Sequence, residues 1–119
     1  MNKEKKYTVG EVCEMFGITR KTLFYYDKID LVEPAERVGV QNHKIYDQKG
    51  IERLQEVLRY REAGLTIEEI KKIINGDKAD TIALLEGIKE RLLNEQNSKT
   101  LQIENLERLI EMYRGKIKP

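Results

Sequence analysis

The sequence predicts a mainly α-helical protein: a winged helix-turn-helix, a second helix pair and a long C-terminal helix. Three observations predict this fold class. Two short amphipathic helix patterns meet at Gly17, and a segment of extended-chain and turn residues follows Pro34. Between residues 80 and 113 the chain has no proline and a single glycine. We therefore expect two domains, residues 1–76 and residues 77–119, of which the second is essentially one long helix.

The first two helices are bounded by capping residues. Thr8 followed by Glu11 fits a capping box, in which the Thr oxygen accepts from the N3 amide and the Glu reaches back. Apolar residues then recur at i, i+3, i+4 and i+7, and Gly17 suits a left-handed cap at the end of that helix. Thr19 can cap a second helix over residues 20–29. Two short helices joined by such a turn are typical of a helix-turn-helix.

The segment after Pro34 predicts a β-hairpin wing. Residues 36–38 and 44–46 are suited to short strands, and Gly39 and Asn42 between them supply turn chemistry. The chain then returns to helical patterns.

Two more helices are predicted after the wing. Asp47 can cap a helix over about 48–62, whose apolar residues repeat at helical spacing. Thr66 and Glu69 form another capping box, which opens a short helix that runs through Ile74.

The last segment, about 80–113, predicts a helix roughly 50 Å long at about 1.5 Å per residue. Its apolar residues lie near a heptad spacing, with the polar Lys99 inside the series. Such a helix has little of its own fold to pack on, so we expect a dimeric coiled coil with a second copy. Lys99 and its polar neighbours are either an ordinary interruption or a layer that sets the register. The predicted dimerisation residues are Leu85, Ile88, Leu92, Leu106, Leu109 and Tyr113.

Composition favours long exposed helices over a large core. Of the 119 residues, 39% are hydrophobic and 36% are charged, and the net charge is +1. A net charge this small does not indicate a nucleic-acid partner, so any basic surface must come from local arrangement. The N-terminus lacks the apolar run of a secretory signal, and no stretch of about 18 apolar residues could span a membrane. We expect a cytoplasmic protein.

The second helix carries three consecutive aromatic residues, Phe24, Tyr25 and Tyr26. At about 3.6 residues per turn, one buried face cannot hold all three rings. Leu23 and Tyr26 share a face that can join the core. The surface away from it, which we call the cationic–aromatic face, carries Arg20, Lys21, Phe24, Tyr25 and Lys28.

The cationic–aromatic face suits the DNA major groove. Cations can pair with phosphates or guanine edges, a Tyr hydroxyl can donate to a phosphate oxygen, and a Phe ring can touch a thymine methyl. The alternative is that Phe24 and Tyr25 pack against the wing or the third helix.

The motifs also occur in an informative order. The chain contains the runs YTVGE (7–11), FGIT (16–19), TLFYYD (22–27), IDLVEP (29–34) and GLTIEEI (64–70). This order resembles the DNA-binding domain of the MerR family of bacterial transcription regulators. The resemblance implies a DNA-binding domain over 1–76 and an antiparallel coiled-coil dimer through 77–119. It also implies a homodimer that binds promoter DNA and bends or untwists it for RNA polymerase.

Site residues follow from the face and from the resemblance. The resemblance places Tyr25 at a phosphate contact, Tyr26 at the boundary between core and DNA, and Lys44 at the position of a wing arginine. The predicted DNA-binding residues are Thr19, Arg20, Lys21, Phe24, Tyr25, Tyr26, Lys44 and Tyr46.

The chain departs from the family pattern at two places. Phe24 stands where family members usually carry Arg, which lowers DNA affinity or shifts the base preference. The wing reads Asn42-His43-Lys44 where Gly-Tyr-Arg is usual. Lys44 keeps the charge but loses the bidentate fork of arginine. His43 is either a wing-tip DNA contact or an exposed loop residue.

Other function classes receive little support. The only histidine is His43, and no Ser/His/Asp set or Gly-rich phosphate loop is present, so we expect no enzymatic activity and no catalytic residues. No cysteine follows Cys13, which disfavours a thiolate metal or iron–sulfur sensor, and we expect no cofactor and no metal. Either the protein has no effector domain, or this sequence lacks a sensing domain that the full gene encodes. The alternatives are an excisionase-like architectural DNA-binding factor and an interaction module whose helix-turn-helix is inert.

Overall fold

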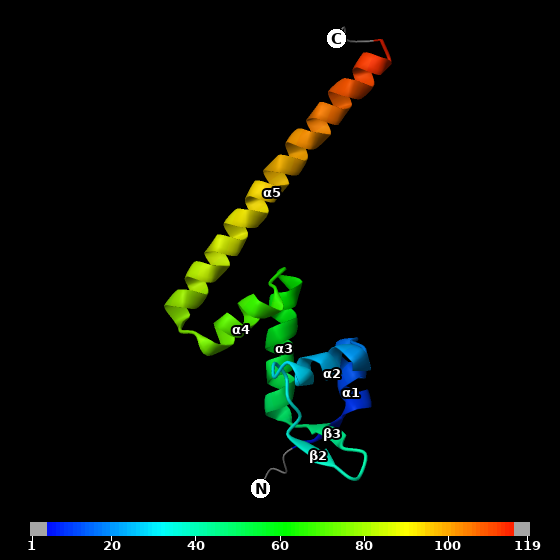
Figure 1. Ribbon diagram of the computed structural model, residues 1–119, viewed down its shortest axis with the longest axis vertical. Coiled ribbons are helices and arrows are strands. Elements are labelled where there is room, and N and C mark those ends of the chain that lie inside the picture. Colours follow the sequence, from blue (N-terminus) through cyan, green and yellow to red (C-terminus); the bar gives the residue numbers. More distant parts are fainter. Residues whose placement is uncertain (1–4, 116–119) are drawn as a thin grey trace. The chain divides into compact units, whose positions relative to one another are not determined.

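The computed structural model describes residues 5–115 of the chain and separates into two compact units (Figure 1). The N-terminal unit ends at Lys71 and the C-terminal unit begins at Lys72. The elements, in chain order, are β1 (Tyr7–Thr8), α1 (Val9–Phe16), α2 (Arg20–Lys28), β2 (Glu36–Val38), β3 (His43–Tyr46), α3 (Gln48–Glu62), α4 (Ile67–Asn75) and α5 (Lys78–Tyr113). The mainly helical winged fold class is confirmed.

The predicted caps form as hydrogen bonds. The Thr8 amide donates to Glu11 Oε1 at 3.0 Å, and the Glu11 amide donates to Thr8 Oγ1 at 3.2 Å, which completes the capping box of α1. Gly17 follows α1 with φ of 64°, a conformation that glycine adopts without the steric cost of a Cβ. Thr19 then caps α2 by accepting from the Thr22 amide at 3.1 Å.

The wing is part of a three-stranded antiparallel sheet in the order β1-β3-β2. The hairpin pairs Arg37 with Lys44 and Val38 with His43, and the Asn42 amide closes its turn on the Gly39 carbonyl at 3.1 Å. The sequence prediction missed β1, which pairs Tyr7 with Tyr46. A strand of two residues has no detectable alternation.

The core of the N-terminal unit lies between the helix pair, the sheet and α3. α1 contacts both α2 and β3, and α3 contacts β3. Asp47 caps α3 by accepting from the Gly50 amide at 3.0 Å. Side chains with less than 2% exposure fill the centre: Val12, Leu23, Val32, Tyr46, Leu54, Val57, Leu65 and Ile70.

The C-terminal unit is dominated by α5. Asp77 caps it by accepting from the Asp80 amide at 2.8 Å, and this cap starts the helix two residues before the predicted position. At about 1.5 Å per residue its 36 residues extend about 54 Å. Within α5 one side chain, Ile88, is buried. Among the described residues, no helix has the length and apolar character needed to cross a membrane.

Candidate nucleic-acid interface

The cationic–aromatic face lies at the surface of the N-terminal unit. Arg20, Lys21 and Lys28 are exposed, as is Thr19 at the cap. The Phe24 and Tyr25 side chains are 39% and 49% exposed, although both rings are large and apolar. Leu23, which is fully buried, anchors the opposite side of α2. The predicted division of this helix into a core side and an outward side is confirmed.

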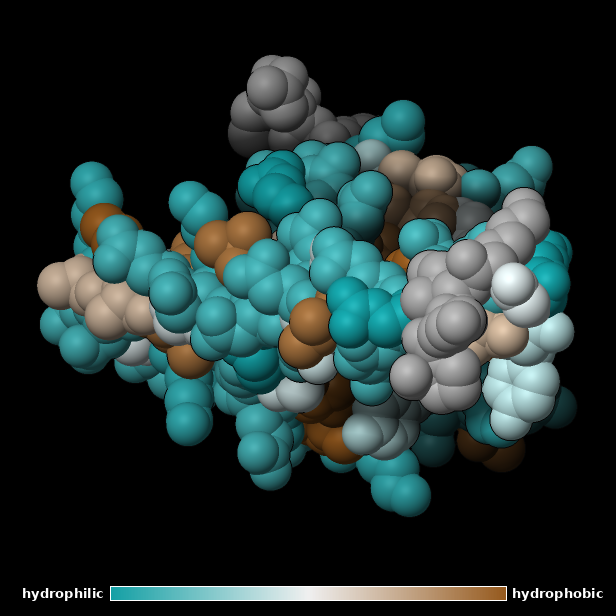
Figure 2. Space-filling model, turned by 90° about the horizontal axis from the view of Figure 1, so that it is seen from above, coloured by the Kyte–Doolittle hydropathy of each residue, from teal (hydrophilic) through white to brown (hydrophobic). Residues whose placement is uncertain are grey.

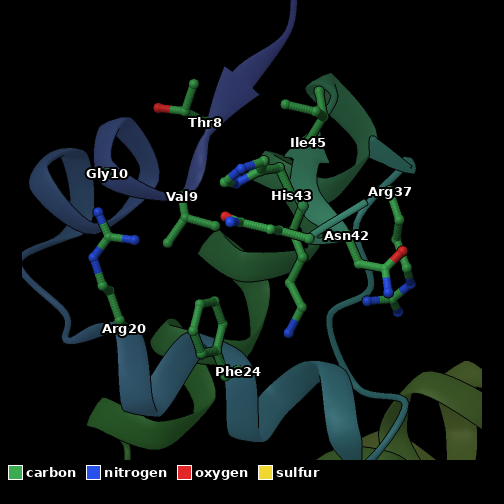
Figure 3. A pocket seen from close by; sticks show the side chains of 11 residues that line it. Thr8, Val9, Gly10, Arg20, Phe24, Arg37, Asn42, His43 and Ile45 are labelled. Carbon is green, nitrogen blue, oxygen red and sulfur yellow. The ribbon is translucent and has the colours of Figure 1, made fainter. Parts of the chain in front are cut away.

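A cleft of about 970 Å³ lies between the wing and the first two helices (Figure 3). Arg20 and Phe24 reach into it from α2, and Asn42 and His43 line it from the wing. Arg20 passes close to α1, where a Cβ at Gly10 would lie 3.6 Å from its Nη2 atom. The cleft therefore gathers cationic and aromatic groups from separate parts of the sequence.

A smaller groove of about 340 Å³ borders the same face. It is lined by Lys21 and by Tyr25 and Tyr26, whose ring centroids lie 6.2 Å apart, and on the other side by Arg61. Arg61 Nη1 donates to the Leu65 carbonyl at 2.8 Å, which holds the guanidinium near the end of α3. The sequence prediction missed Arg61; its place in the last turn of α3 was the available signal.

Asp27 links the wing to α2, and the sequence prediction also missed this role. Its carboxylate is 7% exposed. Arg37 donates to it with both terminal nitrogens at 2.8 Å, and Lys44 Nζ lies 3.0 Å from Oδ2. The Arg37 hydrogen bonds lower the pKa of Asp27, and Lys44 adds to that effect, so the carboxylate is ionised at neutral pH.

Lys44 is also in contact with Phe24. Its Nζ lies 4.0 Å from the centroid of the Phe24 ring, a cation–π geometry. The Lys44 side chain is only 19% exposed. The alternative that Phe24 packs against the wing is thus correct for the ring face that meets Lys44, while 39% of the side chain stays exposed.

Two tyrosines of the predicted DNA-binding set are buried, and for Tyr26 this agrees with its predicted place at the boundary between core and DNA. Tyr46 is 1% exposed and Tyr26 is 6% exposed, so both belong to the core. With so little exposed surface, Tyr46 is poorly placed to contact a duplex directly in this conformation. Tyr26 keeps an edge in the smaller groove. Burial raises the pKa of Tyr46 to about 12, and its hydroxyl has no hydrogen-bond partner among residues 5–115.

His43 is placed in β3, not in a loop. It pairs with Val38 across the hairpin, is exposed, and lines the larger cleft. The hairpin turn itself lies at Gly39 to Asn42, both of which have positive φ.

The predicted dimerisation residues are mostly exposed. Leu85, Leu92, Leu106 and Leu109 are 37–58% exposed, and Tyr113 is 92% exposed. Ile88 is the exception, because it is 5% exposed within the chain itself. The prediction left out five further exposed apolar residues of α5: Ile82, Leu93, Leu101, Ile103 and Ile110. Of these, Ile103 and Ile110 follow Lys99 and Leu106 by four positions and so share their face. Figure 2 shows such hydrophobic side chains standing among hydrophilic ones at the surface.

Comparison with known sequences gives a family match. Residues 7–77 match the family model described as MerR HTH family regulatory protein. The HTH-type transcriptional activator mta of Bacillus subtilis strain 168 is 30% identical over 105 residues, covering 88% of this chain and 40% of the relative. The chain thus spans well under half the length of the first curated relatives that it matches, 31% to 40%.

Solved structures of MerR-family proteins resemble this chain as well. The N-terminal part of the Bacillus subtilis multidrug transporter activator, MtaN, superposes with a TM-score of 0.77 at 30% identity, covering 87% of this chain and 97% of that one. HiNmlR, described as a MerR family regulator lacking the sensor domain, bound to promoter DNA, has a TM-score of 0.58 at 21% identity and covers 93% of this chain and 92% of its own. The second likeness concerns the fold alone.

Proposed function

The chain belongs to the MerR family of helix-turn-helix regulatory proteins, and we propose from this premise that it is a sequence-specific, DNA-binding transcription regulator. It binds promoter DNA as a homodimer, with α2 as the recognition helix of each copy. The DNA-binding domain lies within residues 1–76, and the dimerisation helix, α5, lies within residues 77–119.

The observation that carries this proposal is the exposure of the cationic–aromatic face. A large ring that is 39–49% exposed on a short helix has no role in its own core. Beside those rings stand Arg20 and Lys21, which suit phosphates and base edges. Thr19 and Tyr25 add hydroxyl groups that can donate to phosphate oxygens. Arg61 extends the same surface beyond α2.

Exposed apolar side chains on α5 support the homodimer. A helix with leucines 37–58% exposed along its length loses that apolar area from water when a second copy packs on it. Two copies joined in this way present two recognition helices to one duplex. Pseudo-palindromic target sites suit such a two-fold arrangement.

Deformation of the promoter is part of the proposal. Contacts at two half-sites can offset an elastic cost of a few kcal/mol for bending a short duplex. The description of mta as a transcriptional activator supports a promoter target. RNA polymerase then uses the bent site.

Fluorescence anisotropy with a labelled duplex tests the function. The probe is a duplex that the wild-type protein selects from a random-sequence pool, compared with a scrambled duplex of equal composition. The variant Arg20→Ala/Lys21→Ala/Tyr25→Phe should weaken binding by at least about 100-fold, since it removes two cations and one hydroxyl donor. The control Lys78→Ala/Lys89→Ala removes the same charge from exposed positions of α5 and should bind nearly as the wild type. Equal losses in both variants, or no preference for the selected duplex, would contradict the proposal.

A further inference from the structure

The register of the wing creates an electrostatic problem. Arg37 and Lys44 are directly opposite each other in the β2–β3 hairpin. Like charges in that relation destabilise a pair of strands. The hairpin therefore needs a negative group close to both cations.

Asp27 supplies that group from another element. It belongs to α2, and one carboxylate accepts from Arg37 at 2.8 Å through both oxygens while Lys44 lies 3.0 Å away. A carboxylate only 7% exposed is tolerated when its partners compensate for lost hydration. The buried carboxylate thus depends on the two cations, of which Arg37 is 46% exposed and Lys44 is 19% exposed.

Phe24 is the second residue of α2 that contacts Lys44. It lies three residues before Asp27 on α2, so the two side chains share a face of the helix. The ammonium group has the Asp27 carboxylate on one side and the Phe24 ring, 4.0 Å away, on another. Both contacts tie the wing to α2, the helix that carries the cationic–aromatic face.

We propose that Asp27 is a positioning residue of the DNA interface, which fixes the wing against α2 by holding Arg37 and Lys44. Lys44 then has a structural role: as a strut, it connects the wing to Asp27 and Phe24 of α2 and does not contact a phosphate. The inference rests on the proposed DNA-binding function and deepens it: sequence preference depends on a carboxylate that does not touch DNA.

The structural part of the proposal is testable without DNA. The ε-methylene protons of Lys44 lie by the Phe24 ring, so its ring current should shift their NMR signal upfield, and Phe24→Leu should abolish this shift. Asp27→Asn should reduce the shift strongly. Glu36→Gln is the matched control: it removes one carboxylate charge from the same hairpin, at an exposed ion pair with Lys6, and should leave the shift in place. An unchanged shift in Asp27→Asn overturns the proposal.

Binding measurements test the positioning role. For the wild type and both variants, anisotropy gives the ratio of Kd for the scrambled duplex to Kd for the selected duplex. Asp27→Asn should lower this ratio by about tenfold or more without weakening scrambled-duplex binding, because one negative charge fewer favours non-specific contact. Glu36→Gln should keep the ratio. A preserved ratio in Asp27→Asn, or an equal fall in Glu36→Gln, overturns the proposal.

Lys44→Gln gives an independent answer if Asp27→Asn does not fold, because it leaves the bidentate Arg37–Asp27 pair in place. A phosphate contact predicts that the slope of log K against log salt becomes shallower by about 1. A strut predicts an unchanged slope and a lower preference ratio, and any other combination overturns the proposal. If the wild type itself shows no preference for the selected duplex over the scrambled one, the proposed DNA-binding function is wrong. The NMR shifts then still decide whether Asp27 holds Lys44 against Phe24.

Discussion

The two units of the chain use their apolar residues in opposite ways. The N-terminal unit buries them: Leu23, Leu54 and Leu65 are each no more than 2% exposed. On α5 of the C-terminal unit, leucines such as Leu101 and Leu106 are 58% exposed. The first unit can thus stabilise its fold from within, whereas the second leaves apolar side chains exposed to solvent along α5.

This difference in burial matches the two functions that we propose, DNA contact by the N-terminal unit and dimerisation by α5. A closed core gives α2 a rigid support, so that its outward residues hold a fixed geometry. An open apolar face on a long helix gives up stability in the single chain and gains a place for a second copy. Substitutions in the core and on the exposed face of α5 should therefore have different effects, of which the effect on dimerisation is the largest.

The largest effect should come from the open face. Leu106→Glu/Leu109→Glu should raise the dimer dissociation constant by at least about 100-fold, since each leucine loses roughly 1.5–3 kcal/mol of burial. Sedimentation equilibrium measures it. Asn97→Glu/Thr100→Glu adds the same charge on the other side of α5 and should leave the dimer intact. A dimer that survives the leucine changes would show that this face is not the interface.

A core change should be almost as large, but of another kind. Leu54→Ala should lower the free energy of unfolding by about 2–5 kcal/mol, because a fully buried leucine leaves a cavity. Leu101→Ala, at a position 58% exposed, should cost less than about 0.5 kcal/mol within the single chain. Urea denaturation of the monomeric Leu106→Glu/Leu109→Glu background gives both values. Similar losses at the two positions would remove the contrast between the units.

The Asp27 cluster should give an intermediate effect with a characteristic pH dependence. Asp27→Asn should lower the free energy of unfolding by about 2 kcal/mol at pH 7, because it loses charged hydrogen bonds. The pKa of Asp27 is lowered from 3.8 in the folded chain. Its stabilisation is therefore complete above pH 3.8 and is lost as the pH falls through the lowered value. Urea curves of wild type and variant should converge below that pH; a constant difference would mean that the ionised carboxylate is not the cause.

The smallest effect should come from Tyr46. Its buried hydroxyl has no partner among the described residues, so Tyr46→Phe should leave the free energy of unfolding unchanged or raise it by up to about 1 kcal/mol. Burial raises the pKa of Tyr46 from its ordinary value of 10.0 to about 12 in the folded chain, so the unfolded chain releases this proton first. Stability should fall between pH 10 and 12 in the wild type, and less in the variant. A loss above about 1 kcal/mol in Tyr46→Phe would reveal a hidden partner for the hydroxyl.

Local signals in the sequence predicted most of the elements. Thr8 with Glu11, Thr19 and Asp47 each accept or donate the hydrogen bonds that their cap positions require, because capping depends only on residues three apart. The outward rings of α2 were likewise predictable from helical period. These features need no knowledge of distant contacts.

The remaining features depend on residues far apart in the chain. The sequence pattern assigns no role to Asp27, and its role appears only when the hairpin sets Arg37 opposite Lys44. The hairpin register was the signal that could have found it, since two opposed cations require an anion. Tyr46, which the sequence predicts at the DNA, lies in the core, and it pairs with Tyr7 of β1, a strand that the sequence does not predict.

The measurement that bears most directly on the account is the stoichiometry of the protein on a short duplex. Sedimentation velocity of a labelled, selected duplex with excess protein should show two chains per duplex for the wild type. The Leu106→Glu/Leu109→Glu variant should lose that two-chain complex and bind far more weakly. One wild-type chain per duplex, with affinity unchanged in the variant, would contradict the claim that the open face of α5 brings two closed N-terminal units to one DNA site.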